Sequence, residues 1–145
     1  MKKDVLIFVK GTQEYPINSL ENSIEFFTEG TFYKKGESFY VTYKESELTG
    51  LEGTTTTFKI QPNHITLIRY GDVTSTLIFE PGKRHISTYI TEDGVIMIGV
   101  YTKKMRVDLT ENGGEVFVEY AIDLDSHMMS ENDFLLKIKE AGVKN

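Results

Sequence analysis

The sequence has no cysteine and no tryptophan, and only three prolines. The lack of cysteine excludes disulfides, thiolate metal ligands and a cysteine nucleophile. Phenylalanine and tyrosine, by contrast, are abundant, at nine and eight residues. Aromatic residues combined with so few prolines favour strands over helices.

Basic residues are fewer than acidic ones: the chain has 16 Lys and Arg and 22 Asp and Glu, which gives a net charge of -6. A surface that binds phosphates needs clustered Lys and Arg. The nearest such cluster, Lys103, Lys104 and Arg106, belongs to an acidic chain, so we expect no nucleic-acid partner.

Long hydrophobic runs are missing as well. The first apolar run ends at Val9, too short for the hydrophobic region of a signal peptide, and no small-residue cleavage site follows. No segment approaches the length of a membrane span. These features predict a cytoplasmic protein with no membrane partner.

What the sequence does contain is alternation of apolar and polar residues, interrupted at short intervals by turn residues. This pattern is typical of an antiparallel sandwich or barrel. With 145 residues, no linker and no repeat, the chain is predicted to be one domain, residues 1–145. The short connections favour an all-β, antiparallel up-and-down barrel of about 8–10 strands.

Turn signals mark the boundaries of most strands. We expect a loop over Gln13–Asn22 and a strand through the following segment to about Lys34, although Leu20, Ile24 and Phe27 also have helical spacing. The segment Ser130–Gly142 fits a short helix and a strand equally well. The other predicted strands are Lys3–Thr12, one starting at Glu37, Thr56–Gln61, His64–Tyr70, Ser75–Glu80, Arg84–Thr91, Val95–Leu109 and Glu115–Asp125.

Alternation also assigns the faces of strands, because side chains at i and i+2 share one side of a sheet. Three charged residues, Glu45, Arg69 and Lys103, continue the inward phase of their strands. Inward charges are expected to pair with one another, reach water or hold a ligand. The alternative is that Glu45 is solvated at the end of its strand, where alternation lapses, and that Lys103 extends its ammonium to water from a barrel end.

The stretch Glu45–Thr57 is the most polar connection in the chain. It combines three carboxylates, two glycines and four consecutive threonines. Half of the hydroxyls of Thr54–Thr57 are expected to point inward. This stretch is therefore the candidate functional rim at one end of the barrel.

Motifs of catalysis and metal binding are absent. None of the three histidines, His64, His85 and His127, stands in a metal-ligand motif, and the glycine-rich segments precede strands and cannot form a phosphate site on a helix. His85 shares a face with Ser87 and Tyr89, which we interpret as a polar patch. We predict no catalytic residue, no metal ligand and no cofactor.

Several separated motifs resemble one family. They are Thr49-Gly-Leu-Glu-Gly-Thr-Thr-Thr-Thr57, Gly82-Lys-Arg-His85, Gly99-Val-Tyr-Thr-Lys-Lys104 and Glu111-Asn-Gly-Gly-Glu-Val-Phe-Val-Glu-Tyr120, and the family is that of the small bacterial YwiB-like proteins, a domain of unknown function. The resemblance covers essentially the whole chain. It implies a calycin-like, lipocalin-related barrel whose last segment is a strand, and it implies no activity.

We expect a non-catalytic protein that binds a small, partly apolar ligand within the barrel or at its mouth. The candidate ligand-binding residues are Tyr43, Glu45, Arg69, His85, Tyr101, Lys103 and Tyr120. One alternative is an enzyme that uses a carboxylate or His85 as a base on a small substrate. Another is a protein-interaction module using outer aromatics such as Phe27, Tyr33 or Tyr40. The sequence does not indicate the oligomeric state.

Overall fold

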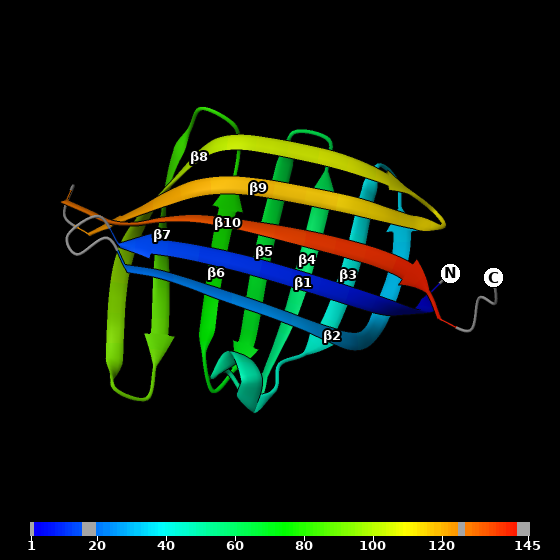
Figure 1. Cartoon of the computed structure of the whole chain (residues 1–145), viewed down its shortest axis with the longest axis horizontal. Coiled ribbons are helices and arrows are strands. Elements are labelled where there is room, and N and C mark those ends of the chain that lie inside the picture. The colour runs from blue at the N-terminus through cyan, green and yellow to red at the C-terminus, as the bar shows by residue number, and fades with distance from the viewer. Residues whose placement is uncertain (1, 16–19, 125–126, 142–145) are drawn as a thin grey trace.

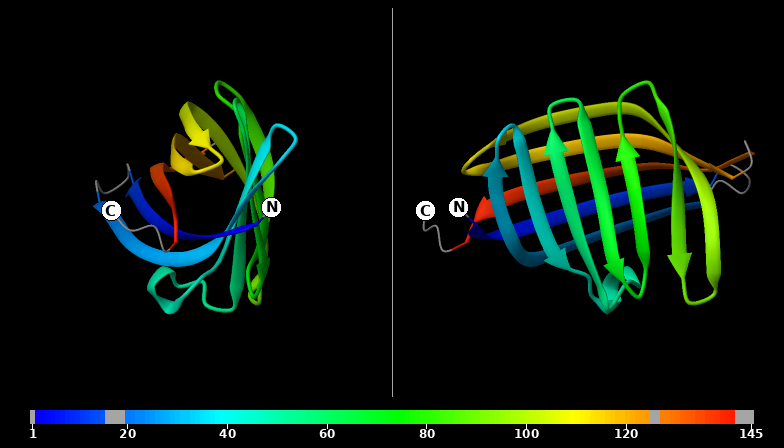
Figure 2. Two further views of the ribbon diagram at one scale, coloured as in Figure 1. Left: turned by 90° about the vertical axis from the view of Figure 1, so that its right-hand side faces the viewer. Right: turned by 180° about the vertical axis from the view of Figure 1, so that it is seen from behind.

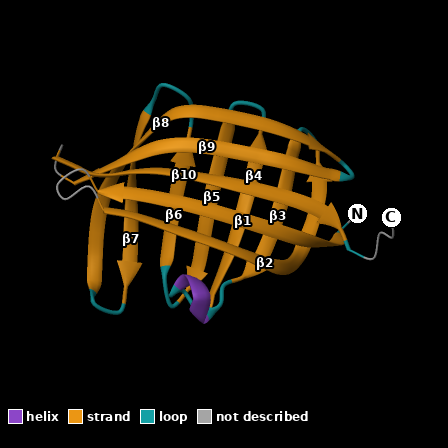
Figure 3. Cartoon of the chain, in the orientation of Figure 1, coloured by secondary structure: helices purple, strands orange, loops and turns teal. Residues whose placement is uncertain are grey.

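The structure, a computed structural model, describes residues 2–15, 20–124 and 127–141. Strands form nearly all of these segments, and their only helix is a single 3-10 turn (Figure 3). No helix in these segments has the length and apolar character to cross a membrane. The elements are β1 (Lys3–Tyr15), β2 (Leu20–Lys35), β3 (Ser38–Lys44), η1 (Glu47–Thr49), β4 (Thr54–Gln61), β5 (His64–Gly71), β6 (Thr74–Phe79), β7 (Arg84–Thr91), β8 (Gly94–Thr110), β9 (Gly113–Leu124) and β10 (His127–Glu140).

The strands form one closed sheet. Each strand pairs antiparallel with the next in sequence, and β1 also pairs with β10. The long strands β8, β9, β10, β1 and β2 cross one side of the barrel, and β3 to β7 cross the other at a steep angle (Figures 1 and 2). The predicted all-β, up-and-down barrel is thereby confirmed, with ten strands.

The first hairpin is longer than predicted. The pairing of β1 with β2 extends from Lys3 opposite Phe32 to Tyr15 opposite Leu20, so most of the expected loop Gln13–Asn22 is strand. Side chains in this extension are exposed or half-buried on both faces, which is why no apolar alternation marked it. Pro16 lies outside the described residues.

The C-terminal segment is the strand β10, as the family resemblance implied. It pairs with β9 on one side and β1 on the other, which closes the barrel. The helical alternative for Ser130–Gly142 is wrong over its described part, because Phe134, Leu136 and Ile138 alternate as buried residues on one face.

A β-bulge in β8 overturns the face predicted for two candidates. The register against β9 shifts between Thr102 and Lys104. Val100 and Thr102 are fully buried before the bulge, whereas Met105 is the next residue packed against the core after it. The extra residue moves the inward phase by one position, so Tyr101 and Lys103 face outward.

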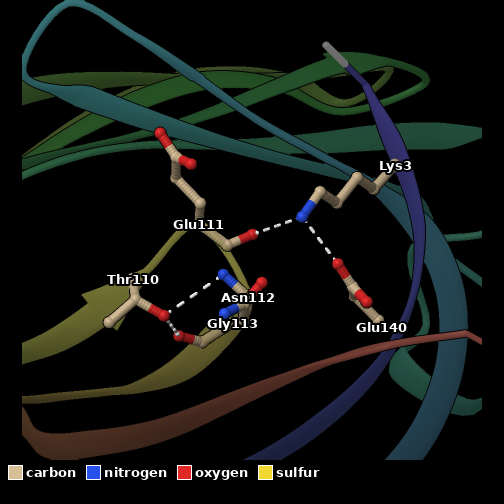
Figure 4. Close-up of polar contacts among 6 residues, drawn as sticks. All are labelled: Lys3, Thr110, Glu111, Asn112, Gly113 and Glu140. Carbon is tan, nitrogen blue, oxygen red and sulfur yellow. Dashed lines mark hydrogen bonds and ion pairs between the residues drawn. The ribbon is translucent and has the colours of Figure 1, made fainter. Parts of the chain in front are cut away.

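The end of the barrel where β1 begins and β10 ends is filled by side chains. Phe32 is 1% exposed and stacks on Phe39 with ring centroids 5.5 Å apart. Lys3 joins β1 to neighbouring elements there, because its ammonium donates to the Glu111 carbonyl at 3.0 Å and to the Glu140 carboxylate at 2.6 Å (Figure 4). We call this region the closed end.

Candidate functional site

The opposite end of the barrel, which we call the open end, holds a cavity of about 590 Å³. This volume lies in the range of small-molecule sites. The floor of the cavity is apolar, and its upper wall carries polar groups from several strands. The floor is lined by Val9, Phe26, Phe58, Leu67, Leu77 and Phe134, and the upper wall by residues that include Tyr43, Glu45, Thr49, Arg69, Tyr89, Tyr120 and Asn132.

Aromatic rings separate the cavity from the closed end. The ring of Phe134 lies 5.5 Å from Phe58 and 5.7 Å from Phe79, and Phe79 meets Tyr120 edge-on at 4.8 Å. Edge-to-face and offset contacts of this kind are favourable and geometrically specific. The cavity therefore has a rigid apolar base.

Glu45 enters the cavity wall from the end of β3. It continues the inward phase of Val41 and Tyr43, and it is only 8% exposed. Its amide donates to the Thr54 carbonyl at 2.9 Å, which extends the pairing of β3 with β4. The inward position predicted for Glu45 is confirmed.

Two threonine hydroxyls satisfy the Glu45 carboxylate. Thr49 donates to Oε1 at 3.0 Å and Thr56 donates to Oε2. Charge-assisted hydrogen bonds of this type offset the loss of hydration when a carboxylate is buried. Glu45 is therefore a structural acceptor in its own right and needs no cation beside it.

The connection between β3 and β4 is shaped by a cap and two glycines. The Ser46 hydroxyl accepts from the Leu48 amide at 3.3 Å and begins η1, and Gly50 ends it with φ of 75°. Gly53 has φ of 87°, and a Cβ there would lie 2.3 Å from the Asp72 carboxylate. A side chain at this position would displace the Asp72 carboxylate and would be strained by the positive φ.

The threonine run after Gly53 alternates as predicted. Thr54 and Thr56 are buried, whereas Thr55 and Thr57 are partly exposed. The Thr54 hydroxyl accepts a hydrogen bond from the Val73 amide at 3.2 Å, and the Thr56 hydroxyl donates one to the Glu45 carboxylate. The inward hydroxyls of Thr54 and Thr56 thus hold the rim together.

Arg69 lies beside this cluster but outside its hydrogen bonds. It stands opposite Thr56 on β4 and Ser75 on β6, and it lines the cavity, so the inward position predicted for it is confirmed. Its Nε is shielded from solvent and lacks a hydrogen-bond partner, as does the buried Ser75 hydroxyl. Among the described residues no carboxylate lies within ion-pair distance of Arg69, so the predicted pairing of inward charges does not occur between Glu45 and Arg69.

Two tyrosine hydroxyls share the electrostatic environment of Arg69. Burial, together with the charge of Glu45 and a hydrogen bond to it, raises the pKa of Tyr43 well above its ordinary value, and Arg69 opposes this shift. Burial likewise raises the pKa of Tyr120, against the opposing charge of Arg69. Both phenols are therefore neutral donors at physiological pH.

Four of the seven candidate residues line one cavity, and three lie elsewhere. The cavity residues are Tyr43, Glu45, Arg69 and Tyr120. Tyr101 is 40% exposed on the outer wall, and Lys103 pairs there with Glu131. The inward orientation predicted for Tyr101 and Lys103 is wrong, because of the bulge in β8.

His85 belongs to a separate polar group on the barrel wall. Its Nε2 lies 3.1 Å from Glu80, whose other carboxylate oxygen lies 3.1 Å from the Lys83 ammonium. Hydrogen bonds from Lys83 and from His85 lower the pKa of Glu80. His85 is half-buried and does not line the cavity.

The candidate list omitted several polar residues that line the cavity, and Asn132 is the most deeply buried one for which the sequence offered a signal. Asn132 is 6% exposed, lines the cavity and donates to the buried Ser130 hydroxyl at 3.0 Å. The alternation of Phe134, Leu136 and Ile138 would have placed Asn132 on the inner face once the segment was accepted as a strand.

A second hollow, of about 610 Å³, lies at the closed end. Most of the residues that line it are exposed, among them the turn residues Glu37, Pro62 and Asn112. We favour the open-end cavity as the candidate site because its walls are inner faces of strands and include an unpaired cation. Among the described residues, no cluster of three or more His, Asp or Glu is arranged to hold a metal ion.

The outer wall carries several exposed apolar side chains. Phe27 is 79% exposed and lies 4.9 Å from the Phe8 ring, and Tyr33 stacks on Tyr40 at 4.8 Å. On the hairpin of β7 and β8, Val95 and Met97 are 64% and 60% exposed. The interaction-module alternative stays a prediction.

Fold and site together define a closed β-barrel with an internal, partly polar cavity. The chain belongs to the family described as "Domain of unknown function (DUF1934)", which matches residues 7–136. It is 29% identical over 112 residues to the uncharacterized beta-barrel protein YwiB of Bacillus subtilis (strain 168), a match covering 77% of this chain and 75% of that one. The crystal structure of the ywiB protein from Bacillus subtilis superimposes with a TM-score of 0.80 at 22% identity, covering 97% of this chain and 93% of the other. The resemblance to the YwiB-like family is thereby confirmed.

Proposed function

We propose that this protein is a non-catalytic binder of a small, partly apolar ligand, which occupies the open-end cavity. The observation that carries the proposal is a cavity of about 590 Å³ with an aromatic floor and convergent polar groups on its upper wall. Small-molecule sites usually have this composition. The calycin-like character and the cytoplasmic location expected from the sequence stay predictions.

The enzyme alternative has weaker support. His85, its candidate base, lies outside the cavity and is bonded to Glu80. Glu45 lines the cavity, but Thr49 and Thr56 occupy both of its oxygens. A general base must reach the proton that it abstracts, and neither group is placed free at the cavity surface.

A pair of substitutions at adjacent positions tests the binding proposal. Ile98 lines the cavity, whereas Met97 faces outward and is 60% exposed. Tryptophan at position 98 is expected to fill the cavity, and tryptophan at position 97 to project into solvent. The assay is fluorescence titration with the neutral apolar probe N-phenyl-1-naphthylamine.

We expect wild type and Met97→Trp to bind the probe and Ile98→Trp to bind at least about ten-fold more weakly. Equal binding by both variants would place the probe elsewhere and count against the proposal. Native mass spectrometry of protein from its own host then identifies the resident ligand.

A further inference from the structure

The open-end cavity contains one cation and more than one carboxylate. Among the described residues that line it, Arg69 is the only basic side chain, and Glu45 and Asp133 are the acidic ones. The Glu45 carboxylate accepts hydrogen bonds from two threonine hydroxyls and forms no ion pair with Arg69. Arg69 thus lines the cavity without an ion pair among the described residues, and its Nε has no hydrogen-bond partner.

An unpartnered guanidinium nitrogen shielded from water is unfavourable in the empty protein. Buried polar atoms nearly always find a partner, and leaving a donor unsatisfied costs the loss of its hydration. Here two unpaired polar atoms, Arg69 Nε and Ser75 Oγ, come from residues directly opposite each other on β5 and β6. Of these two residues only Arg69 lines the cavity, so a ligand there can reach its guanidinium but not the Ser75 hydroxyl.

We propose, resting on the function proposed above, that the ligand is an organic monoanion with an apolar body, its anionic head bound by Arg69. A guanidinium offers forked N–H donors that fit a carboxylate. The neutral hydroxyl of Tyr120, which lies within the electrostatic influence of Arg69, supplies a further donor beside it, whereas the Tyr43 hydroxyl is bonded to Glu45. The apolar body lies against the floor formed by Phe58 and Phe134.

The surrounding carboxylates set the charge of the ligand. The buried carboxylate of Glu45 disfavours a second negative charge in the same cavity, and Asp133 adds negative charge at its rim. A monocarboxylate is consequently preferred over a phosphate monoester, which carries close to two charges at neutral pH.

Matched probes separate this inference from the broader proposal. Decanoate, decanol and decyl phosphate share one chain and differ in the head group. Isothermal titration calorimetry of the delipidated full-length protein is expected to show decanoate binding about ten- to a hundred-fold more tightly than decanol, the value of a charge-assisted hydrogen bond. Decyl phosphate is expected to bind more weakly than decanoate.

Two variants complete the experiment. Arg69→Met is expected to reduce decanoate binding to the level of decanol and to leave decanol binding unchanged. Lys103→Met removes a cation from the outer wall and is expected to change neither. Since Arg69→Met removes an unpaired charge, thermal unfolding should show it at least as stable as wild type, which guards against loss of binding through misfolding.

The outcomes are distinct. If no probe binds the wild type, the ligand-binding function itself fails and this inference falls with it. If decanol binds as tightly as decanoate, or Arg69→Met weakens both equally, the cavity binds ligands but the anionic head is disproved. Tighter binding of decyl phosphate would overturn the monoanion assignment.

Discussion

The two ends of the barrel are built from the same strands and differ in what their inner faces carry. At the closed end the side chains of Phe32, Ile60 and Ile65 are almost fully buried in the core. At the open end the same alternation places Glu45, Arg69 and Asn132 on the inner face, around a cavity of about 590 Å³. Close packing at one end thus coexists with an unfilled interior at the other.

This difference suggests that the closed end supplies most of the folding stability and that the open end binds the ligand. A filled core contributes most of the free energy of folding, because burial of apolar area is the dominant stabilising term. An unpaired Arg69 Nε and an unpaired Ser75 hydroxyl contribute nothing to stability. We assign binding to the open end because its inner face carries polar groups around an unfilled cavity.

The largest expected effect is at the closed end. Phe32→Ala removes a ring that is 1% exposed and stacked on Phe39, and it should lower the free energy of unfolding by about 3–5 kcal/mol. Tyr89→Ala truncates a half-buried ring that faces the cavity, with an expected loss of about 1 kcal/mol or less. Urea denaturation measures both losses. Equal losses would refute the claim that the closed end supplies most of the folding stability.

The second effect tests whether the open end has a structural network of its own. Glu45→Ala leaves the hydroxyls of Thr49 and Thr56 without their acceptor and should cost about 1–3 kcal/mol. Glu47→Ala, an exposed control in η1, should stay within about 0.5 kcal/mol of wild type. If Glu45→Ala left the free energy of unfolding unchanged, the rim would be held by backbone hydrogen bonds alone.

The wall of the barrel could be predicted from sequence because alternation directly records which side chains are buried. Val116 and Val118 on β9 were assigned correctly for that reason, and so were Glu45 and Arg69. Turn residues such as Pro62 and Gly82 marked strand ends because their backbone preferences are local. Local signals were sufficient wherever strand pairing is regular.

The errors occurred where the pattern depends on the partner strand. The bulge that turns Lys103 outward is a feature of the register between β8 and β9, and no residue in either strand signals it alone. The extension of β1 to Tyr15 depends on pairing with β2, since its side chains are not buried. Whether Glu45 meets Arg69 is a matter of three-dimensional distance, which alternation does not contain.

The third prediction concerns pH. Because the pKa of Tyr43 is raised above its ordinary value of 10.0, the unfolded chain loses this proton first as pH rises. The contribution of Tyr43 is therefore complete below about pH 10 and declines above it, by on the order of 1 kcal/mol at pH 11. Urea denaturation of wild type and Tyr43→Phe between pH 8 and 11 measures this, and the variant should lose less stability over that range. Parallel curves would show that the Tyr43 hydroxyl is accessible to water.

The smallest expected effect is at the closed end, in the contacts of Lys3 shown in Figure 4. Lys3 bridges the Glu111 carbonyl and the Glu140 carboxylate, but about a third of each charged side chain in the ion pair is exposed, at 34% and 32%. Solvent screens such a pair, and exposed ion pairs contribute about 0–1 kcal/mol. Lys3→Met should therefore lower the free energy of unfolding by less than about 1 kcal/mol, and less still in high salt. A loss comparable to that of Phe32→Ala would show that the closed end depends on this ion pair as well as on its packed core, and the contrast between an apolar end and a polar end would no longer hold.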